Sequence, residues 1–144
     1  MRQAVLLPFC LKAEDIIKIG SSFPLKHAVS CVGITHIWAA QSGIVSGVGE
    51  GLFSPITSIT SQEMAVMLAN YTNLKGIEIP AYREMPSFRD YASIADCAYY
   101  AARALAQAGV INGSYDEFAP LRTASRAEVA TMFKNYLRFV VEGN

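Results

Sequence analysis

A helix end, a loop and a helix start follow one another in the stretch Gly109-Val-Ile-Asn-Gly-Ser-Tyr-Asp-Glu-Phe-Ala-Pro-Leu-Arg-Thr-Ala-Ser-Arg-Ala-Glu-Val-Ala-Thr-Met132. Gly109 follows the apolar run 98–108 and tolerates a positive φ, so it predicts the end of a helix. Phe118-Ala-Pro120 is predicted to be extended, because the residue before a proline is disfavoured in the helical region. Ser125 and Glu128 stand three residues apart before an apolar series, which predicts a capping box and a second helix.

The same pattern occurs earlier in the chain. Gly43 and Gly47 precede Gly109 and Gly113 by 66 positions (109 − 43), and after a one-residue gap the offset becomes 65 (125 − 60). The pairs with the second offset are Phe53/Phe118, Pro55/Pro120, Thr60/Ser125, Glu63/Glu128, Ala65/Ala130, Met67/Met132, Asn70/Asn135 and Tyr71/Tyr136. A repeat of this length indicates stacked supersecondary units, because one helix pair cannot bury its own apolar faces.

These landmarks resemble, in their order, the S-layer homology (SLH) repeat: Phe-x-Asp, an apolar helix, Gly-Val-x-x-Gly, Phe-x-Pro and Thr/Ser-Arg-Ala-Glu. Residues 88–136 contain all five landmarks, and residues 23–71 form a degenerate copy. In that copy Leu25 stands in place of the Asp and Ser61 in place of the Arg. The resemblance implies a mainly α-helical fold in which helix-loop-helix repeats pack as an SLH-type pseudo-threefold bundle, incomplete here.

Four segments are predicted along the chain. A degenerate repeat covers 23–75, a connector covers 76–87, and the better repeat covers 88–141. Residues 1–22 match the first half of neither repeat. They are interpreted either as a remnant of a preceding repeat or as an irregular N-terminal segment.

Helix boundaries are predicted from caps. The first helix of repeat one is expected at about 26–41, and that of repeat two near Ser93, with Asp96 in a further capping box. The residues expected to cap helices are Thr60, Glu63, Ser125, Glu128, Gly43 and Gly109.

The composition excludes some partners. Twelve basic and twelve acidic residues leave no net charge, so nothing favours nucleic acid or an anionic membrane. A hydrophobic fraction of 52% and a mean hydropathy of +0.27 indicate apolar surface that meets a partner or a missing repeat. The uncharged stretch 28–49 is interpreted as part of the first repeat and not as a membrane span, because glycines, His36 and Gln41 interrupt it.

Catalytic and metal sites are not predicted. His27 and His36 have no carboxylate or Cys at motif spacing, and no nucleophile motif or phosphate loop occurs, so we expect neither an enzyme nor a cofactor. Cys10, Cys31 and Cys97 show neither zinc spacing nor a disulfide framework. Cys31 and Cys97 are expected at equivalent buried positions.

A binding site is predicted around Arg126. A guanidinium in the first turn of a helix, beside free backbone N–H groups, suits a carboxylate or phosphate. Arg122, Asn112, Ser114 and Tyr115 lie in the preceding loop and are expected to complete a groove. The alternatives are that Arg126 lies over the helix surface and that the loop residues serve turn chemistry.

The resemblance implies a function for this site: noncovalent anchoring to a bacterial cell wall through an anionic, pyruvylated secondary cell-wall polysaccharide linked to peptidoglycan, with Arg126 among the ligands. A cell-surface location is implied by the resemblance alone. The apolar run 4–11 makes a poor export signal and does not support that location independently. Two alternatives stay open. One is a helical protein-interaction or self-assembly module that forms a homo-oligomer, and the other is a truncated fragment without binding activity.

Overall fold

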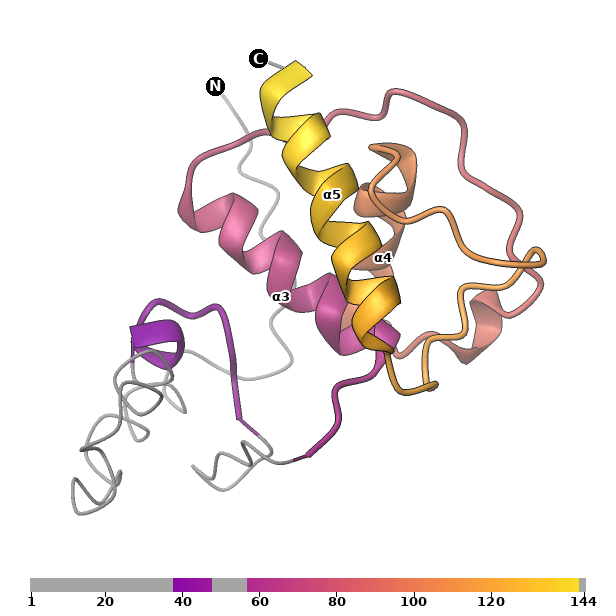
Figure 1. The fold of residues 1–144 in the computed structure, drawn as a ribbon, viewed down its shortest axis with the longest axis horizontal. Coiled ribbons are helices and arrows are strands. Elements are labelled where there is room, and N and C mark those ends of the chain that lie inside the picture. The colour runs from indigo at the N-terminus through magenta and orange to yellow at the C-terminus, as the bar shows by residue number, and fades with distance from the viewer. Residues whose placement is uncertain (1–37, 48–56, 143–144) are drawn as a thin grey trace. The chain divides into compact units, whose positions relative to one another are not determined.

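A computed structural model describes residues 38–47 and 57–142 of the chain. The described residues belong to two compact units, one with residues 58–142 and one with residues 38–47 and Thr57. The first unit contains three α-helices and one 3-10 helix (Figure 1), which are α3 (Ser61–Leu74), η2 (Tyr91–Ser93), α4 (Asp96–Gln107) and α5 (Arg126–Glu142). The mainly helical architecture predicted from the sequence is confirmed, and the described part shows isolated β-bridges but no strand.

The second unit is described only in part. Residues 38–41 are helical, and Gly43 follows with φ +71°. The rest of the predicted helix at 26–41 and the predicted N-terminal segment 1–22 lie outside the described residues.

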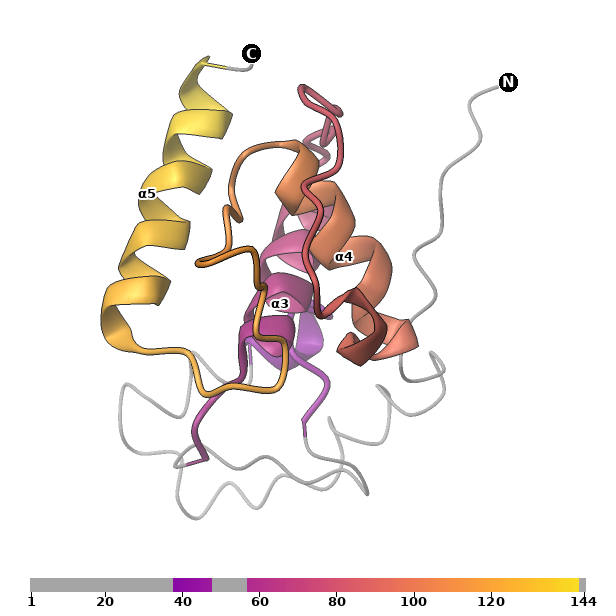
Figure 2. The same cartoon turned by 90° about the vertical axis from the view of Figure 1, so that its right-hand side faces the viewer.

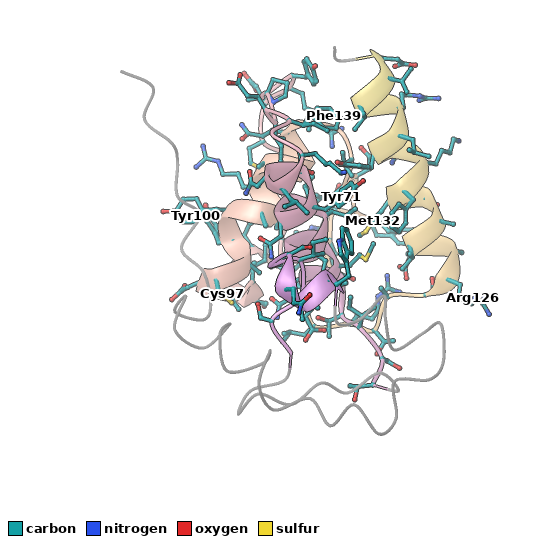
Figure 3. The ribbon with its side chains drawn as sticks, turned by 90° about the vertical axis from the view of Figure 1, so that its left-hand side faces the viewer. Tyr71, Cys97, Tyr100, Arg126, Met132 and Phe139 are labelled. Atoms are coloured by element: carbon teal, nitrogen blue, oxygen red, sulfur yellow. The ribbon has the colours of Figure 1, made fainter. Side chains whose placement is uncertain are left out.

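The three helices of the first unit run in roughly the same direction, and α4 and α5 lie on different sides of α3 (Figures 2 and 3). Between helices, long connections return the chain to the end of the unit at which all three helices begin. At that end the backbone N–H of Ser61 donates to the carbonyl of Arg122, and that of Ala124 donates to the carbonyl of Ile59, both within 3.1 Å. The chain before α3 is therefore tied to the chain before α5.

The core lies between α3 and its two neighbours. Ala98, Ala102 and Ala106 are almost completely buried on α4, and side chains this small let two helices approach closely. On the α5 side, the hydroxyl of Thr72 donates to the Tyr136 hydroxyl at 3.1 Å. Tyr71 and Tyr136, which are equivalent residues of the two repeats, meet edge to face with ring centroids 6.3 Å apart.

The starts of α3 and α4 differ. Thr60 and Glu63 form a reciprocal capping box at α3, in which each side chain accepts from the other residue's backbone N–H. The capping box predicted for Ser93 and Asp96 is wrong. Helix α4 begins at Asp96 after an N-cap residue, Ala95, that has no side-chain cap. The backbone N–H of Ala95 donates instead to the side-chain amide oxygen of Gln62 on α3, at 3.1 Å.

Cys97 also differs from its prediction. Its side chain is exposed on α4 and is disulfide-bonded, whereas a buried free thiol was expected. Position 97 lies outside the helix face that carries Ala98 and Leu105, so packing against α3 does not bury it (Figure 3). None of the helices described is long and apolar enough to cross a membrane.

Candidate functional site

The loop between α4 and α5 is held by a side chain from the start of the repeat. Asp90 accepts hydrogen bonds from the backbone N–H groups of Phe118 and Ala119, at 2.9 and 2.6 Å. Ala119 has φ +53°, so the extended conformation predicted for Phe118-Ala-Pro120 is wrong at this residue. The two bonds to Asp90 fix the backbone in a conformation that the rule for residues before proline does not anticipate.

The Phe of the same Phe-x-Asp motif packs beneath the loop. The ring of Phe88 stacks on that of Phe118 with centroids 6.1 Å apart. Gly113 has φ +67°, and a Cβ atom on it would lie 2.4 Å from Cε1 of Phe88 and 2.7 Å from the carbonyl oxygen of Glu117. Only glycine satisfies both the positive φ and this close approach. The separate motif elements therefore build one rigid loop.

This loop and the first half of α5 enclose a cavity of about 470 Å³. Four of the five predicted binding residues line it: Asn112, Ser114, Tyr115 and Arg122. Tyr115 has φ +53° and a side chain that is 95% exposed, so its ring stands at the rim of the cavity. The cavity thus offers amide and hydroxyl groups together with an exposed aromatic ring.

Arg122 is neutralised by a neighbour within this cavity. Its guanidinium pairs with the carboxylate of Glu128. Glu128 also accepts the backbone N–H of Ser125 at 2.8 Å, while the Ser125 hydroxyl accepts the backbone N–H of Glu128 at 3.3 Å. The bonds from Ser125, followed by the charge of Arg122, lower the pKa of Glu128 below its ordinary value.

Arg126, the residue with the strongest predicted role, lies outside the cavity lining. It is the first residue of α5, and its side chain projects outward from the bundle (Figure 3). Its guanidinium makes no hydrogen bond or ion pair with any residue in the described part of the chain. The two arginines before and within α5 therefore differ, since Arg122 is paired and Arg126 is available.

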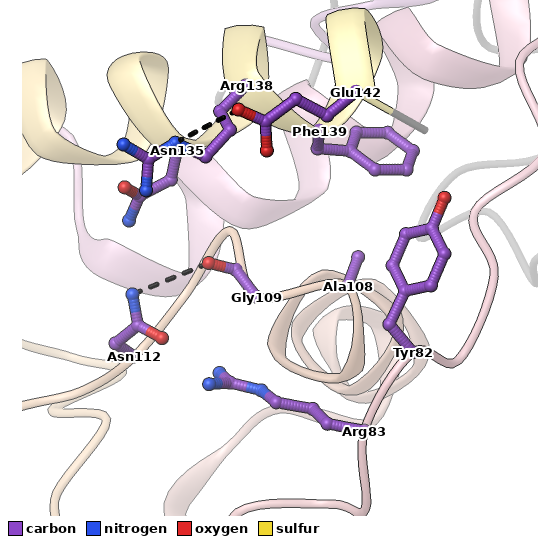
Figure 4. Close-up of a pocket in the computed structure, with 9 residues that line it drawn as sticks. All are labelled: Tyr82, Arg83, Ala108, Gly109, Asn112, Asn135, Arg138, Phe139 and Glu142. Carbon is purple, nitrogen blue, oxygen red and sulfur yellow. Dashed lines mark hydrogen bonds and ion pairs between the residues drawn. The ribbon is translucent and has the colours of Figure 1, made fainter. Parts of the chain in front are cut away.

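A second cavity, of about 440 Å³, lies between the end of α4 and the last turns of α5 (Figure 4). Arg83 reaches it from the connector and donates to the carbonyl oxygens of Ala106 and Ile111, at 2.7 and 2.8 Å. Asn135 lines both cavities and donates to the carbonyl of Val110 at 3.2 Å. The sequence interpretation missed both residues, although the pairing of Asn135 with Asn70 across the repeats could have indicated the asparagine.

The described helices and their supporting loop define a helix-loop-helix repeat module whose second helices contact each other through equivalent tyrosines. The chain belongs to the S-layer homology domain family, which matches residues 37–65 and 87–130. These two segments make up half of the 144 residues and correspond to the degenerate and the better copy of the repeat.

Membership of this family assigns the general class of function. S-layer homology domains bind cell-wall polymers, anchor proteins at the cell wall or surface layer, and are a binding rather than an enzymatic family. No curated protein and no solved structure matches the chain significantly.

Proposed function

We propose that this chain anchors noncovalently to the bacterial cell wall by binding an anionic, pyruvylated secondary cell-wall polysaccharide, with Arg126 as its cationic contact. The observation that carries the proposal is the state of that guanidinium, which is exposed and unpaired among the described residues. An unpaired guanidinium can bind a carboxylate through two parallel hydrogen bonds. Family membership supports a cell-wall polymer as the ligand class.

Arg122 has a different role in this proposal. Because Glu128 already neutralises its charge, Arg122 adds little to the attraction of an anion. Its side chain instead forms part of the cavity wall, and the pair holds the loop against the first turn of α5. The net positive charge offered to the ligand at this end of α5 then comes from Arg126.

The cavity beside Arg126 suits the neutral part of a sugar. Asn112 and Ser114 present amide and hydroxyl groups that can bond to sugar hydroxyls, and the exposed Tyr115 ring offers a stacking surface. A volume of about 470 Å³ is within the ordinary range for small-ligand sites. Because Arg126 lies outside this cavity, a ligand that uses both has to extend between them, as a polysaccharide chain does.

Cosedimentation of the full chain with peptidoglycan sacculi tests the proposal, using sacculi before and after chemical removal of the secondary polymer. We expect binding to intact sacculi only. Arg126→Ala should weaken binding about 10-fold or more, because a hydrogen bond to a charged group contributes about 1.5–3 kcal/mol. Arg103→Ala is the matched control, since Arg103 is also an exposed helical arginine but lies on α4.

Two results would contradict the proposal. Full affinity of Arg126→Ala for intact sacculi would show that the arginine is not a contact. Equal binding to stripped and intact sacculi would show that the ligand is peptidoglycan itself. Arg126→Lys keeps the positive charge but removes the planar guanidinium. Binding that depends on charge alone should survive this change, whereas binding through two parallel hydrogen bonds should be weakened.

A further inference from the structure

The two cavities described above lie along the same side of helix α5. We call the one of about 470 Å³ the proximal cavity and the one of about 440 Å³ the distal cavity. Their lining residues on α5 recur every three or four positions, which places them on one side of the helix, and include Glu128, Thr131, Asn135, Arg138 and Glu142. Asn112 and Asn135 line both cavities, so the two cavities adjoin at these asparagines.

The junction between the cavities offers hydrogen-bond acceptors. The side-chain N–H of Asn112 donates to the Gly109 carbonyl at 3.4 Å, and that of Asn135 donates to the Val110 carbonyl at 3.2 Å. These bonds orient both amides. Each side-chain oxygen accepts no hydrogen bond from a residue in the described part of the chain. A sugar hydroxyl can donate to such an oxygen, so the junction suits a neutral sugar.

The balance of charge differs between the two cavities. The distal cavity is lined by two guanidinium groups and one carboxylate, from Arg83, Arg138 and Glu142. The proximal cavity is lined by one guanidinium group and two carboxylates, from Arg122, Glu117 and Glu128. An acidic group is therefore attracted to the distal cavity and repelled by the proximal one.

The two arginines of the distal cavity are held in different ways. Arg83 is fixed by its bonds to the carbonyls of Ala106 and Ile111, so its charge is already in position. Arg138 has only a loose partner, because its Nε lies 3.7 Å from Oε1 of Glu142 and the two side chains are 62 and 70% exposed. An exposed ion pair of this kind contributes little, so an acidic group of a ligand can replace Glu142.

The distal cavity also has a polar side and an aromatic side. In Figure 4 the polar ends of both arginines and both asparagines lie toward one side, and the rings of Tyr82 and Phe139 lie toward the other. These two rings meet edge to face with centroids 6.3 Å apart. A sugar ring has hydroxyl edges and C–H faces, so an acidic sugar matches both sides of this cavity.

We propose that the distal cavity is a second contact for the polysaccharide, in which Arg138 binds a further acidic group of the polymer chain that Arg126 binds. This inference rests on the proposed function. The two arginines are 12 positions apart on α5 (138 − 126 = 12), or about 18 Å along the helix axis at about 1.5 Å per residue. One sugar ring cannot span this length. The module therefore recognises several consecutive sugars and not a single unit.

Isothermal titration calorimetry of the full chain tests this second contact. The probes are fragments of the secondary polymer released from sacculi and separated by size, one set with a single repeating unit and one set several units long. We expect the wild type to bind the long fragments more tightly. Arg138→Ala should weaken their binding about 5-fold or more, as expected for one exposed charge contact, and leave single-unit binding unchanged.

Lys134→Ala is the matched control and should change neither affinity, because Lys134 is an exposed cation on α5 that lines neither cavity. Glu142→Gln adds a test by gain of binding. It removes the carboxylate that competes for Arg138, so affinity for the long fragments should rise severalfold. All three side chains are exposed, so these substitutions should leave the fold intact.

Three results would overturn the inference. They are wild-type affinity of Arg138→Ala for the long fragments, an equal loss of affinity in Lys134→Ala, and equal affinity of the wild type for both fragment sizes. Arg126→Ala reports separately on the proposed function and should weaken binding of both sizes. If it does so while Arg138→Ala changes neither, the proposed function stands and the second contact fails. If the wild type binds neither size, both fail.

Discussion

Oδ2 of Asp90 accepts a hydrogen bond of 2.6 Å from the backbone N–H of Ala119, 29 residues further along the chain. The other carboxylate oxygen, Oδ1, accepts a hydrogen bond of 2.9 Å from the backbone N–H of Phe118. One carboxylate at the start of the repeat thus controls the loop that forms the candidate site. The degenerate repeat has Leu25 at the equivalent position, so it lacks this acceptor.

Removal of that carboxylate should destabilise the loop. Asp90→Ala leaves two backbone N–H groups without an acceptor, and we expect a loss of about 1–3 kcal/mol in the free energy of unfolding. Asp90→Asn keeps one acceptor and should lose less. Urea unfolding followed by circular dichroism measures both. Asp116→Asn, on an exposed side chain of the same loop, should change stability by less than about 0.5 kcal/mol.

Gly113 and Gly109 should respond differently to alanine. Both have positive φ, at +67° and +77°, so each substitution introduces strain of about 1–2 kcal/mol. A Cβ on Gly109 meets nothing within 4 Å, whereas one on Gly113 meets Phe88 and the backbone of Glu117. Gly113→Ala should therefore cost about 1–3 kcal/mol more than Gly109→Ala, from overpacking. Equal thermal denaturation midpoints for the two variants would refute this packing.

The buried hydrogen bond between Thr72 and Tyr136 should couple α3 to α5. Thr72→Val and Tyr136→Phe each remove one hydroxyl while nearly preserving shape. Because Thr72 also donates to the Leu68 carbonyl at 2.6 Å, its hydroxyl is shared between two acceptors. A double-mutant cycle on the free energy of unfolding should give a coupling of about 1 kcal/mol. Strict additivity would show that the bond does not form.

Glu128 should make stability depend on acid pH. Its folded pKa is lowered below the ordinary 4.5, first by the bonds from Ser125 and then by Arg122. The stabilisation is therefore present above pH 4.5 and is lost as the pH falls through the folded pKa. Glu128→Gln removes this titration, so its free energy of unfolding should vary less between pH 5 and pH 2. Identical pH dependence in both proteins would exclude Glu128 as the source.

Short-range features of this chain could be predicted from spacing alone. Each capping box joins two residues that are three positions apart, so residue type and separation suffice to predict it. The two boxes are Thr60 with Glu63 and Ser125 with Glu128. Gly109 lies just after the end of α4 because a glycine tolerates φ +77°. The family was recognisable for the same reason, since its landmarks are local turns and caps in a fixed order.

Long-range contacts account for the errors. The start of α4 depends on Gln62, 33 residues before Ala95, and the backbone at Ala119 depends on Asp90. In the candidate site, nothing in the spacing of Arg122 and Arg126 distinguishes a paired guanidinium from an available one. That difference arises because the carboxylate of Glu128 pairs with Arg122 and not with Arg126.

The helical repeat, its caps and its family could be recognised from residue order, because these features depend on interactions among residues within a few positions of each other. Which of two equivalent surfaces is covered depends on the packing of helices. Leu68 and Phe133 occupy the same repeat position, yet one is 4% and the other 45% exposed. Burial depends on whether a neighbouring helix is present, and neither residue's own sequence context contains that information.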